Sequence, residues 1–490
     1  MLDRILQLAT IFQAHGKQLY MVGGTVRDLL LQRQTTLDAD LTTDATPQEI
    51  KQLAAETHPS AMVLVGEQFG TVQLRYRRQE PAEAGALNGA HEGATAEDVI
   101  EITTFRTERY NPDSRKPEVG FGTVLEEDLL RRDFTTNAMA RDPLTGVIID
   151  PYGGRADLEA HLLRAVGNEP EKRFDEDPLR ILRAVRFAAQ LDFTIEQRTA
   201  EAIVKQAHTL EKISRERIRD EMNKILLSSR PTLGLRLMVD LGVMQWVIPE
   251  MLDLRGVSQR PAHSKDVYAH TLQVVQNTPQ RLLTRWAGLL HDIAKPRTRT
   301  VEDGKVHFFG HDEVGAYMAR DILRRLKFDR DHIEQVSHLV RMHMRSNAYT
   351  SEWTDGAVRR LMLEMGDHLP DLLDLSQADI TSYRPEKVSR AVARVQELRA
   401  RAAYLKEEAE RVPLKSPLDG VELMELFGRG PGPWLKPIKE HLLGLVIDGN
   451  LAPDDKEGAA SEARAFMEAH SELQLAGEQR GEGAGTARQA

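Results

Sequence analysis

Two aspartates, Asp38 and Asp40, are separated by a single residue in the stretch LDADLTT (37–43). The stretch has the composition of a β-strand, in which side chains two positions apart point to the same face. Two carboxylates on one face repel each other unless a cation lies between them or water reaches both. The pair alone is therefore compatible with a solvated strand edge or with a Mg²⁺ site, because Mg²⁺ is bound by one or two carboxylates together with substrate phosphates.

A glycine-rich turn, VGGTVRD (22–28), lies ten residues before the aspartates. Gly23 and Gly24 permit close approach of the backbone to a bulky anion, and the helix that follows offers free N–H groups to a phosphate. Arg27 falls in the first turn of that helix, where the helix dipole disfavours a cation, so a bound phosphate would remove the conflict. Turn, arginine and paired carboxylates together predict a nucleotide held with two metal ions, which would activate an attacking hydroxyl and stabilise leaving pyrophosphate.

Two later segments add arginines and acids. EEDLLRRDFTTNAMARD (126–142) places an Arg pair next to Asp133 and near Asn137, a pattern that also suits a capped helix with surface salt bridges. FDEDPLRILRAVRFAAQL (174–191) predicts a helix whose apolar side chains share one arc, with Asp and Arg around the opposite half. The polar half consists of Asp177, Arg180, Arg183 and Arg186.

This polar half of the helix has two interpretations. It can be a solvated face with a weak Asp177–Arg180 pair. Alternatively, one arginine fork and one carboxylate hydrogen-bond the edge of a base, while the other arginines hold a triphosphate.

Histidines and aspartates are spread over a second, helical region of about 110 residues. They are His270, the adjacent pair His291 and Asp292, His311, His343 and Asp379. Imidazole and carboxylate ligands on several helices can bind a divalent metal without cysteine, and the chain has no cysteine. An adjacent His-Asp pair is ordinarily structural, but the whole series predicts a second metal centre.

The elements that must position these groups change character along the chain. Strand patterns occur up to about residue 150, for example at 71–76 and 98–105, and helical periodicity dominates from about 155 to 475. We therefore predict an α+β fold with a mixed-sheet head followed by helical parts. The predicted divisions are a head at 1–155, a neck and body at 156–255, a metal-binding domain at 256–410, a tail at 411–475 and a disordered end at 476–490. An exposed insertion is predicted at 77–97, and a Pro- and charge-rich loop at 110–121.

The composition is that of an ordinary soluble globular chain of 490 residues, with 41% hydrophobic and 29% charged residues. No apolar run approaches the roughly 18 residues that a membrane span needs, and the first residues lack the features of a signal peptide. We expect a cytoplasmic protein. The net charge of −10 lies in two segments, 79–101 and 451–490, so it does not exclude a basic surface for nucleic acid elsewhere.

Four motifs in this order resemble the class II tRNA nucleotidyltransferases and bacterial poly(A) polymerases. They are VGGTVRD, LDADL, LLRRDFTTNAMARD and EDPLRILRAVRFAAQLDF, and the similarity covers about residues 17–230, including SRERIRDEMNKIL (214–226). The resemblance implies a DNA-polymerase-β-like head with a helical neck, body and tail. It implies that Asp38 and Asp40 carry catalytic Mg²⁺ and that Asp177 and Arg180 act as a protein template for the incoming base. The remaining implied nucleotide-binding residues are Gly24, Arg27, Arg132, Arg183 and Arg186, with Glu101 as a candidate third acid near the metals.

The second region resembles the HD phosphohydrolase superfamily, through LLHDIAKPRTRT and GHDEVGA. The resemblance implies a metal bound by His270, His291, Asp292 and Asp379, with His311 and His343 as candidate ligands of a second ion. A metal-bound hydroxide would then hydrolyse a phosphoester, for example a 2′,3′-cyclic phosphate at an RNA end.

The expected activity is template-free addition of C, C and A to tRNA 3′ ends from CTP and ATP, with tRNA and the two nucleotides as partners and no membrane. Three alternatives stay open. The enzyme could add only CC or only A; it could be a poly(A) polymerase, which the acidic tail disfavours; or it could be an HD phosphohydrolase with a nucleotide-sensing head.

Overall fold

The structure, a computed structural model, describes residues 1–33, 38–65, 70–77, 97–109, 118–258, 266–382, 384–411 and 414–470. Most of the predicted insertion at 77–97, most of the loop at 110–121 and the predicted disordered end lie outside these residues. The chain divides into two compact units. Unit 1 comprises residues 1–253 with 325–328, and unit 2 comprises residues 254–324 with 329–490.

Unit 1 begins with a mixed seven-stranded sheet in the order β3-β4-β5-β2-β1-β8-β9. The strands are β1 (Leu19–Val22), β2 (Asp38–Thr43), β3 (Ala61–Val65), β4 (Thr71–Arg77), β5 (Glu97–Thr104), β8 (Ala140–Arg141) and β9 (Ile148–Ile149). β2 and β5 are parallel, and the other neighbours are antiparallel. A separate antiparallel pair is formed by β6 (Arg106–Arg109) and β7 (Glu118–Phe121).

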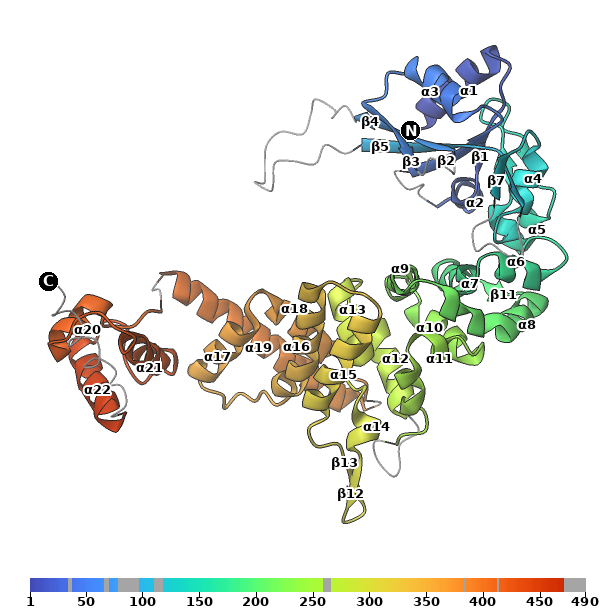
Figure 1. Cartoon of the computed structure of the whole chain (residues 1–490). Helices are drawn as coiled ribbons and strands as arrows, with labels where there is room; N and C mark the ends of the chain where they lie inside the picture. The colour runs from blue at the N-terminus through green and yellow to red at the C-terminus, as the bar shows by residue number, and fades with distance from the viewer. Residues whose placement is uncertain are drawn as a thin grey trace, which may run out of the picture. The chain divides into compact units, whose positions relative to one another are not determined.

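One face of this sheet is covered by helices α1 (Leu2–Ala14) and α3 (Pro47–Ala55) (Figure 1). β5 alternates between buried and half-buried residues, so Ile100 and Ile102 lie in the core while Glu101 lies on the opposite face. α3 starts at a capping box, in which the Thr46 hydroxyl and the Glu49 carboxylate satisfy backbone N–H groups. The short helices α2 (Gly24–Leu30) and α4 (Leu125–Leu130) complete the head.

The rest of unit 1 is helical. It comprises α5 (Gly154–Glu159), α6 (Pro170–Glu176), α7 (Leu179–Leu191), α8 (Gln197–Gln206), α9 (Arg215–Leu226), α10 (Pro231–Asp240) and α11 (Met244–Val247). Short 3₁₀ turns lie at Thr135–Asn137, Ala207–Lys212 and Pro249–Leu254, and β10 (Leu162–Leu163) pairs in parallel with β11 (Thr194–Ile195). The predicted apolar arc of α7 is fully buried, at Leu182, Val185, Ala188 and Ala189. Gly234 lets α10 approach α7 closely, since a Cβ there would lie 3.2 Å from the Cβ of Ala189.

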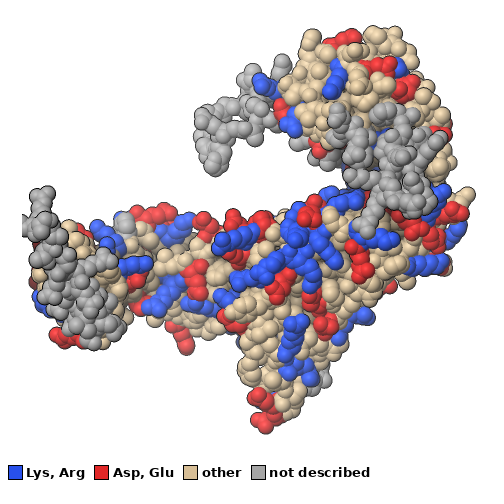
Figure 2. Space-filling model, in the orientation of Figure 1, with Lys and Arg blue, Asp and Glu red and all other residues tan. Residues whose placement is uncertain are grey.

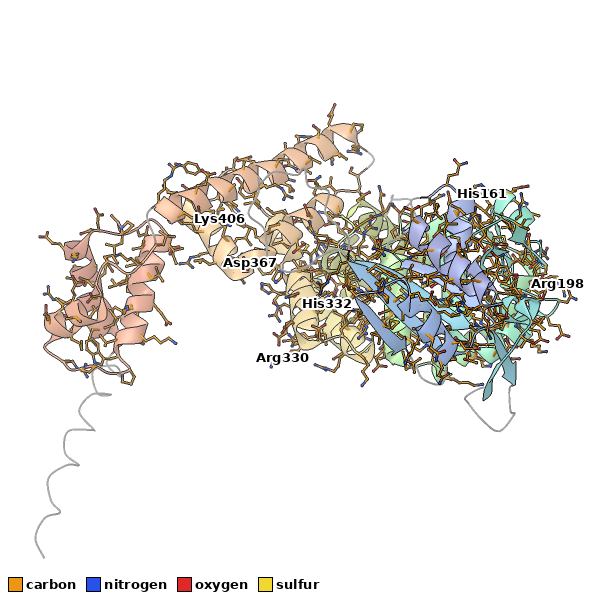
Figure 3. The ribbon with its side chains drawn as sticks, turned by 90° about the horizontal axis from the view of Figure 1, so that it is seen from above. His161, Arg198, Arg330, His332, Asp367 and Lys406 are labelled. Atoms are coloured by element: carbon orange, nitrogen blue, oxygen red, sulfur yellow. The ribbon has the colours of Figure 1, made fainter. Side chains whose placement is uncertain are left out.

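Unit 2 is almost entirely helical. It comprises α12 (Val267–Asn277), α13 (Leu282–Leu290), α14 (Lys295–Thr298), α15 (His311–Arg325), α16 (Arg330–Asn347), α17 (Asp355–Met365), α18 (Leu369–Ala378) and α19 (Pro385–Arg411). A hairpin of β12 (Thr300–Glu302) and β13 (Lys305–His307) stands between α14 and α15, and a 3₁₀ turn covers Gly366–His368. Charged side chains line the exposed faces, of which Arg330 on α16 and Lys406 on α19 are labelled in Figure 3.

The last three helices of unit 2 have a core of their own. They are α20 (Gly420–Phe427), α21 (Leu435–Ile447) and α22 (Lys456–Ala469), and they pack around Trp434, Leu442 and Met467. Across the ranges described above, no helix combines the length and apolarity needed to cross a membrane. The mixed-sheet head followed by helical parts, predicted from the sequence, is confirmed.

Candidate functional site

The glycine turn between β1 and α2 brings a cation next to a catalytic candidate. Gly23 has φ +67°, a conformation that favours glycine. A Cβ at this position would lie 2.9 Å from Nη1 of Arg132 and 3.7 Å from Oδ2 of Asp40. The Asp40 N–H donates to the Thr25 hydroxyl over 3.0 Å, which ties the first turn of α2 to β2. The turn therefore places Arg132 and Asp40 against the same bare backbone.

Three carboxylates lie on the same face of the neighbouring strands β2 and β5. Asp38 and Asp40 share this face of β2, and Glu101 of β5 lies directly opposite Asp40 in the parallel ladder. Burial raises the pKa of Asp40, Arg132 opposes that shift, and the charges of Glu101 and Asp38 raise the pKa further. A divalent cation bound by these oxygens would relieve the repulsion, so the donor set fits the metal predicted from the sequence.

Glu101 is held by a chain of side chains that the sequence did not reveal. Gln73 on β4 donates from Nε2 to Oε1 of Glu101 over 2.9 Å, and Arg75 donates from Nε to Oε1 of Gln73 over 3.1 Å. Gln73 lies opposite Glu101 in the antiparallel ladder. Only knowledge of the strand register could have linked these residues.

A cavity of about 430 Å³ in unit 1 opens beside Asp40. Of the candidates predicted from the sequence, it is lined by Gly23, Gly24, Arg27, Asp40, Arg132, Asp177, Arg180 and Arg183. Asp38 and Arg186 are not among its lining residues. The described lining includes six arginines and three aspartates, so the cavity carries a net positive charge that suits a triphosphate.

A continuous hydrogen-bond chain runs along the wall of this cavity from α2 to α7. Arg27 donates to Oδ1 of Asn137 over 2.8 Å, and Asn137 donates to Oδ1 of Asp133 over 2.9 Å. Oδ2 of Asp133 accepts from Nε of Arg183, also over 2.8 Å. Burial alone would raise the pKa of Asp133, but Arg183 and Asn137 lower it to about 2. The segment that could have been a capped surface helix is therefore a buried network.

Asp177 and Arg180 do not form the surface pair considered from the sequence. Oδ1 of Asp177 caps the N–H of Leu179 over 3.1 Å, and Oδ2 accepts from Nη2 of Arg217 over 2.9 Å. Arg180 donates to Oε2 of Glu176 over 2.8 Å and to the carbonyl of Arg131 over 2.7 Å. Separate partners thus fix the two groups at the cavity wall.

Arg186 has a different environment from the other arginines of α7. It is 8% exposed and lies against the buried Glu221 of α9, with Nε 3.2 Å from Oε2. Burial lowers its pKa to about 10. The guanidinium groups of Arg27, Arg183 and Arg186 lie 5.1, 5.3 and 4.2 Å from the centre of the Phe187 ring. Phe187, which the sequence did not single out, therefore packs against three cations.

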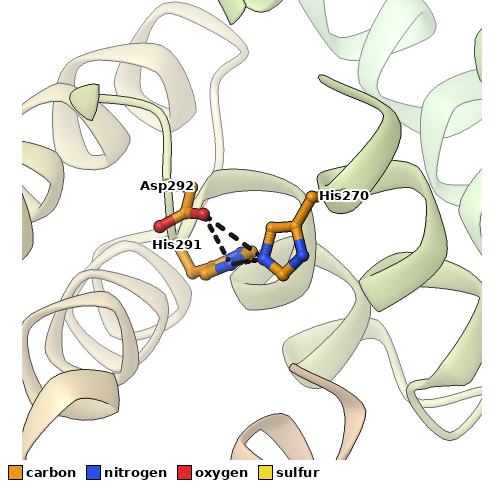
Figure 4. Close-up of side chains that lie close together, drawn as sticks. All are labelled: His270, His291 and Asp292. Carbon is orange, nitrogen blue, oxygen red and sulfur yellow. Dashed lines mark hydrogen bonds and ion pairs between the residues drawn. The ribbon is translucent and has the colours of Figure 1, made fainter. Parts of the chain in front are cut away.

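The histidines and aspartates of unit 2 converge on one buried cluster. Figure 4 shows His270, His291 and Asp292, whose ligand atoms lie within 4.8 Å of one another, as do those of Asp292, His311 and His343. Asp379 joins them, with Oδ1 2.9 Å from Nε2 of His270. The structure brings together all six residues predicted over this region, with Asp292 shared by both groups.

The imidazoles of this cluster are oriented from behind. Nδ1 of His291, His311 and His343 donates to the carbonyls of Gly288, Phe308 and Val340, and Nδ1 of His270 lies 2.8 Å from the Thr381 hydroxyl. Each Nε2 is then left to face the cluster, as in metal sites whose ligands are oriented by outer partners. Nε2 of His311 is buried and makes no hydrogen bond with the described residues. An orphaned buried acceptor next to a carboxylate fits a metal ligand.

The ionisable groups of the cluster shift one another's pKa values. Burial alone would lower the pKa of His291, but Asp292 and Asp379 raise it to about 10. Burial and the neighbouring His291 lower the pKa of His343 to about 4. Despite burial, the pKa values of Asp292 and Asp379 lie well below the usual range because of the imidazoles, with Lys295 also acting on Asp292. Two carboxylates stay ionised in a buried place, which suits a divalent cation.

Family models match three parts of the chain. Residues 19–164 match the poly A polymerase head domain, residues 192–254 match the probable RNA and SrmB-binding site of polymerase A, and residues 261–384 match the HD domain. The candidate nucleotide turn and carboxylates lie in the first match, and the His/Asp cluster lies in the third.

Curated relatives and solved structures resemble most of the chain. It is 35% identical to the A-adding tRNA nucleotidyltransferase of Deinococcus radiodurans, over 71% of this chain and 80% of the relative. It is 36% identical to the CC-adding tRNA nucleotidyltransferase of Thermus thermophilus, over 70% of this chain and 77% of the relative. The crystal structure of the Bacillus stearothermophilus CCA-adding enzyme in complex with CTP superposes with a TM-score of 0.66 at 27% identity, covering 96% of this chain and 98% of the other.

Proposed function

Since the chain belongs to the family of tRNA nucleotidyltransferases and poly(A) polymerases, we propose that it adds C and A to tRNA 3′ ends from CTP and ATP without a nucleic-acid template. The observation that carries the proposal is the cavity of unit 1. It joins the glycine turn, Asp40 and the arginines of α7 in one positively charged space.

The proposed reaction is nucleotidyl transfer. The oxygen of the tRNA 3′-hydroxyl forms a bond to the α-phosphorus and its proton passes to solvent, while the bond to the bridging oxygen of the β-phosphate breaks and pyrophosphate leaves. Asp38 and Asp40 would hold Mg²⁺, which when bound polarises the reacting oxygens and stabilises the leaving group. Arg27, Arg132 and Arg183 neutralise and orient the triphosphate, so catalysis depends on positioning and charge.

Asp177 and Arg180 can read the base by hydrogen bonding. A carboxylate accepts from the exocyclic amine that C and A both carry, whereas U and G present a carbonyl oxygen at that place. The guanidinium of Arg180 donates to acceptors on the same edge. Because Leu179, Arg217 and Glu176 hold these two groups, their positions do not depend on a nucleic-acid template.

The test is an incorporation assay with purified protein and three tRNA substrates, ending before the first C, before the second C and before the final A. Each is given CTP, ATP or both. Addition of all three nucleotides is the expected outcome; addition of CC alone or of A alone would assign the chain to one of a pair of enzymes. Long A tracts on unrelated RNA, or no incorporation on any tRNA, would overturn the tRNA proposal.

A second activity is supported by the six-residue cluster in unit 2. We propose that it binds a divalent metal and hydrolyses phosphoesters, since its two carboxylates are ionised and its imidazoles are oriented by outer partners, as in a metal site. Metal content after gel filtration and hydrolysis of bis(p-nitrophenyl) phosphate test this directly. A metal-free protein under metal-replete conditions would overturn it. The cytoplasmic location expected from the sequence stays a prediction.

A further inference from the structure

The segment between Asp292 and His311 begins and ends at the His/Asp cluster of unit 2. It runs through α14 and the hairpin β12–β13, which stands out from the helices (Figure 1). Thr300 pairs with His307, so the two ends of the excursion are held side by side. We use the term hairpin base for four residues at the end of the hairpin nearest the helices. They are Arg297, Arg299, His307 and Phe309.

An aromatic surface lies on the hairpin base. The rings of His307 and Phe309 are stacked, with centres 4.9 Å apart and planes 10° from parallel. Phe309 is nevertheless 66% exposed. Since His307 covers one face of the phenyl ring, the other face is open to solvent. An apolar ring kept in water beside an ordered partner is a ready stacking surface for another flat ring.

Residues before and after the hairpin connect the hairpin base to the His/Asp cluster. The carbonyl of Phe308 accepts from Nδ1 of His311 over 2.7 Å. Nζ of Lys295 donates to Oδ2 of Asp292 over 2.7 Å and lies 5.4 Å from the centre of the Phe308 ring. Phe309 is two residues from His311, so their Cα atoms are at most about 7.6 Å apart. The stacking surface is therefore within a nucleotide's reach of the cluster.

Cations accompany the aromatic pair. Arg297 lies in the last turn of α14 and Arg299 precedes β12, and both side chains are exposed. Thr300 follows Arg299 and lies opposite His307, so Arg299 sits at the same end of the hairpin as the stacked rings. Figure 2 shows basic side chains along this protrusion. Guanidinium groups next to a free aromatic face form the combination that binds both the phosphate and the base of a single-stranded nucleotide.

We propose that the hairpin base is the nucleotide-binding platform of the His/Asp cluster, where it positions the RNA 3′-end phosphoester that the HD resemblance implies as substrate. A base stacks on the open face of Phe309, Arg297 and Arg299 bind the adjoining phosphates, and the phosphoester to be cleaved lies at the cluster. Hydrolysis adds one water: a new P–O bond forms from water oxygen, the bond to the leaving oxygen breaks, and that oxygen takes up a proton. This inference rests on the proposed phosphohydrolase function.

The first arm of the test measures binding without turnover. The full chain is titrated with adenosine 3′-monophosphate in EDTA, and the Phe309→Ala variant is compared with the unmodified protein. Because the adenine would lose its stacking on Phe309, the dissociation constant of the Phe309→Ala variant for adenosine 3′-monophosphate should rise about 5- to 100-fold. Tyr317→Ala is the matched control, because Tyr317 is an aromatic residue of α15 that is 58% exposed, and it should bind normally. Equal affinity of the Phe309→Ala variant would overturn the platform.

The second arm separates the platform from the hydrolase proposal. With metal restored, Phe309→Ala should raise KM for adenosine 2′,3′-cyclic phosphate and leave KM for a ribose 2′,3′-cyclic phosphate that lacks a base unchanged. An equal loss for both would show that Phe309 acts only through folding, and would overturn the platform. If the unmodified protein hydrolyses neither compound, the hydrolase proposal fails while the binding arm still decides the platform. A short oligoribonucleotide 3′-phosphate should bind more tightly than the mononucleotide, and equal affinity would overturn the RNA-end assignment.

Discussion

The carboxylates of unit 1 and those of unit 2 have opposite electrostatic surroundings. Burial and neighbouring acids raise the pKa of Asp40, whereas imidazoles and Lys295 hold that of Asp292 far below its usual range. The first site lies beside an open cavity of about 430 Å³, whereas the second is a cluster of mostly buried side chains. From this difference we infer that a metal of unit 1 would arrive with the nucleotide, whereas a metal of unit 2 would be resident.

The supporting contacts differ in the same way. In unit 2, short imidazoles are oriented by backbone carbonyls, which leave them little freedom. In unit 1, long arginines are linked through polar side chains, as in the chain from Arg27 through Asn137 and Asp133 to Arg183. A network of long side chains can adjust to two bases of different size, whereas a metal cluster needs fixed ligands.

The largest expected effect is that of Asp40→Asn. Loss of a direct metal ligand should lower nucleotide incorporation at least about 100-fold, since even outer partners of a metal are worth 10–100-fold. Folding should be unchanged or slightly more stable, because the raised pKa means that the charged form of Asp40 is unfavourable in the native state. Single-turnover incorporation and urea unfolding measure the two quantities.

Asp3→Asn is the control for Asp40→Asn, since Asp3 is an exposed residue of α1. It should retain full incorporation. An Asp40→Asn variant that keeps more than half of the activity would contradict the assignment of the metal to β2.

The next effect separates the two sites within one chain. His343→Ala should remove bound metal from unit 2 and lower any phosphoester hydrolysis at least about tenfold, but leave nucleotide incorporation unchanged. Elemental analysis and both assays are run on the same preparation. His338→Ala is the matched control, because His338 is a half-buried residue of the same helix whose Nε2 lies 3.1 Å from the Glu364 carbonyl and not in the cluster. A parallel loss of incorporation in His343→Ala would show that the two sites are not independent.

The loss of stability in acid should depend on the protonation of Asp133. Its folded pKa of about 2 lies below the unfolded value of about 3.9, so its contribution is complete above about pH 4 and is lost as the pH falls towards 2. The difference amounts to about 2.5 kcal/mol. Asp133→Asn should therefore lower the free energy of unfolding at pH 7 by roughly this amount and flatten the acid limb, measured by urea titration at pH 7 and pH 3.

Asp192→Asn is the comparison for Asp133→Asn, because the Asp192 side chain is 56% exposed. It should change stability by less than about 1 kcal/mol. If the two substitutions have equal effects, the buried network between α2 and α7 contributes nothing specific.

The features that the sequence predicted are those that depend on local periodicity and on the order of motifs. The same-face aspartates of β2 and the buried arc of α7 follow from spacing, and the convergence of six His and Asp residues in unit 2 is what the resemblance to the HD superfamily implies. The finer division into five segments stays a prediction, as do the roles of the individual site residues.

What the sequence could not show depends on tertiary partners. The helical wheel places Arg186 on the polar half of α7, but α9 packs there, so Arg186 faces the buried Glu221. Asp177 is likewise held by Arg217, forty residues later, and not by the nearby Arg180. Helical periodicity assigns a side chain to a half of the helix, and only packing decides whether that half meets solvent or another helix.

The smallest expected effect is that of Gly23→Ala. Comparison with Gly242→Ala separates the displacement of Arg132 from the backbone strain that both substitutions cause. Gly23 and Gly242 have nearly the same φ, +67° and +68°, so substitution by Ala should cost each about 1 kcal/mol of stability. A Cβ at Gly242 meets nothing within 4 Å, whereas one at Gly23 meets Arg132 at 2.9 Å. Gly23→Ala should therefore also displace Arg132 and raise KM for CTP and ATP about fivefold, the equivalent of one weakened charge-assisted contact.

Gly242→Ala supplies the strain without the displacement, so its KM values should equal those of the unmodified protein. Equal KM values in both variants would mean that Arg132 does not reach the triphosphate from its position beside Gly23. The cavity would then hold the nucleotide through Arg27 and Arg183 alone, and the contrast between the two units would rest on Asp40 and not on the turn.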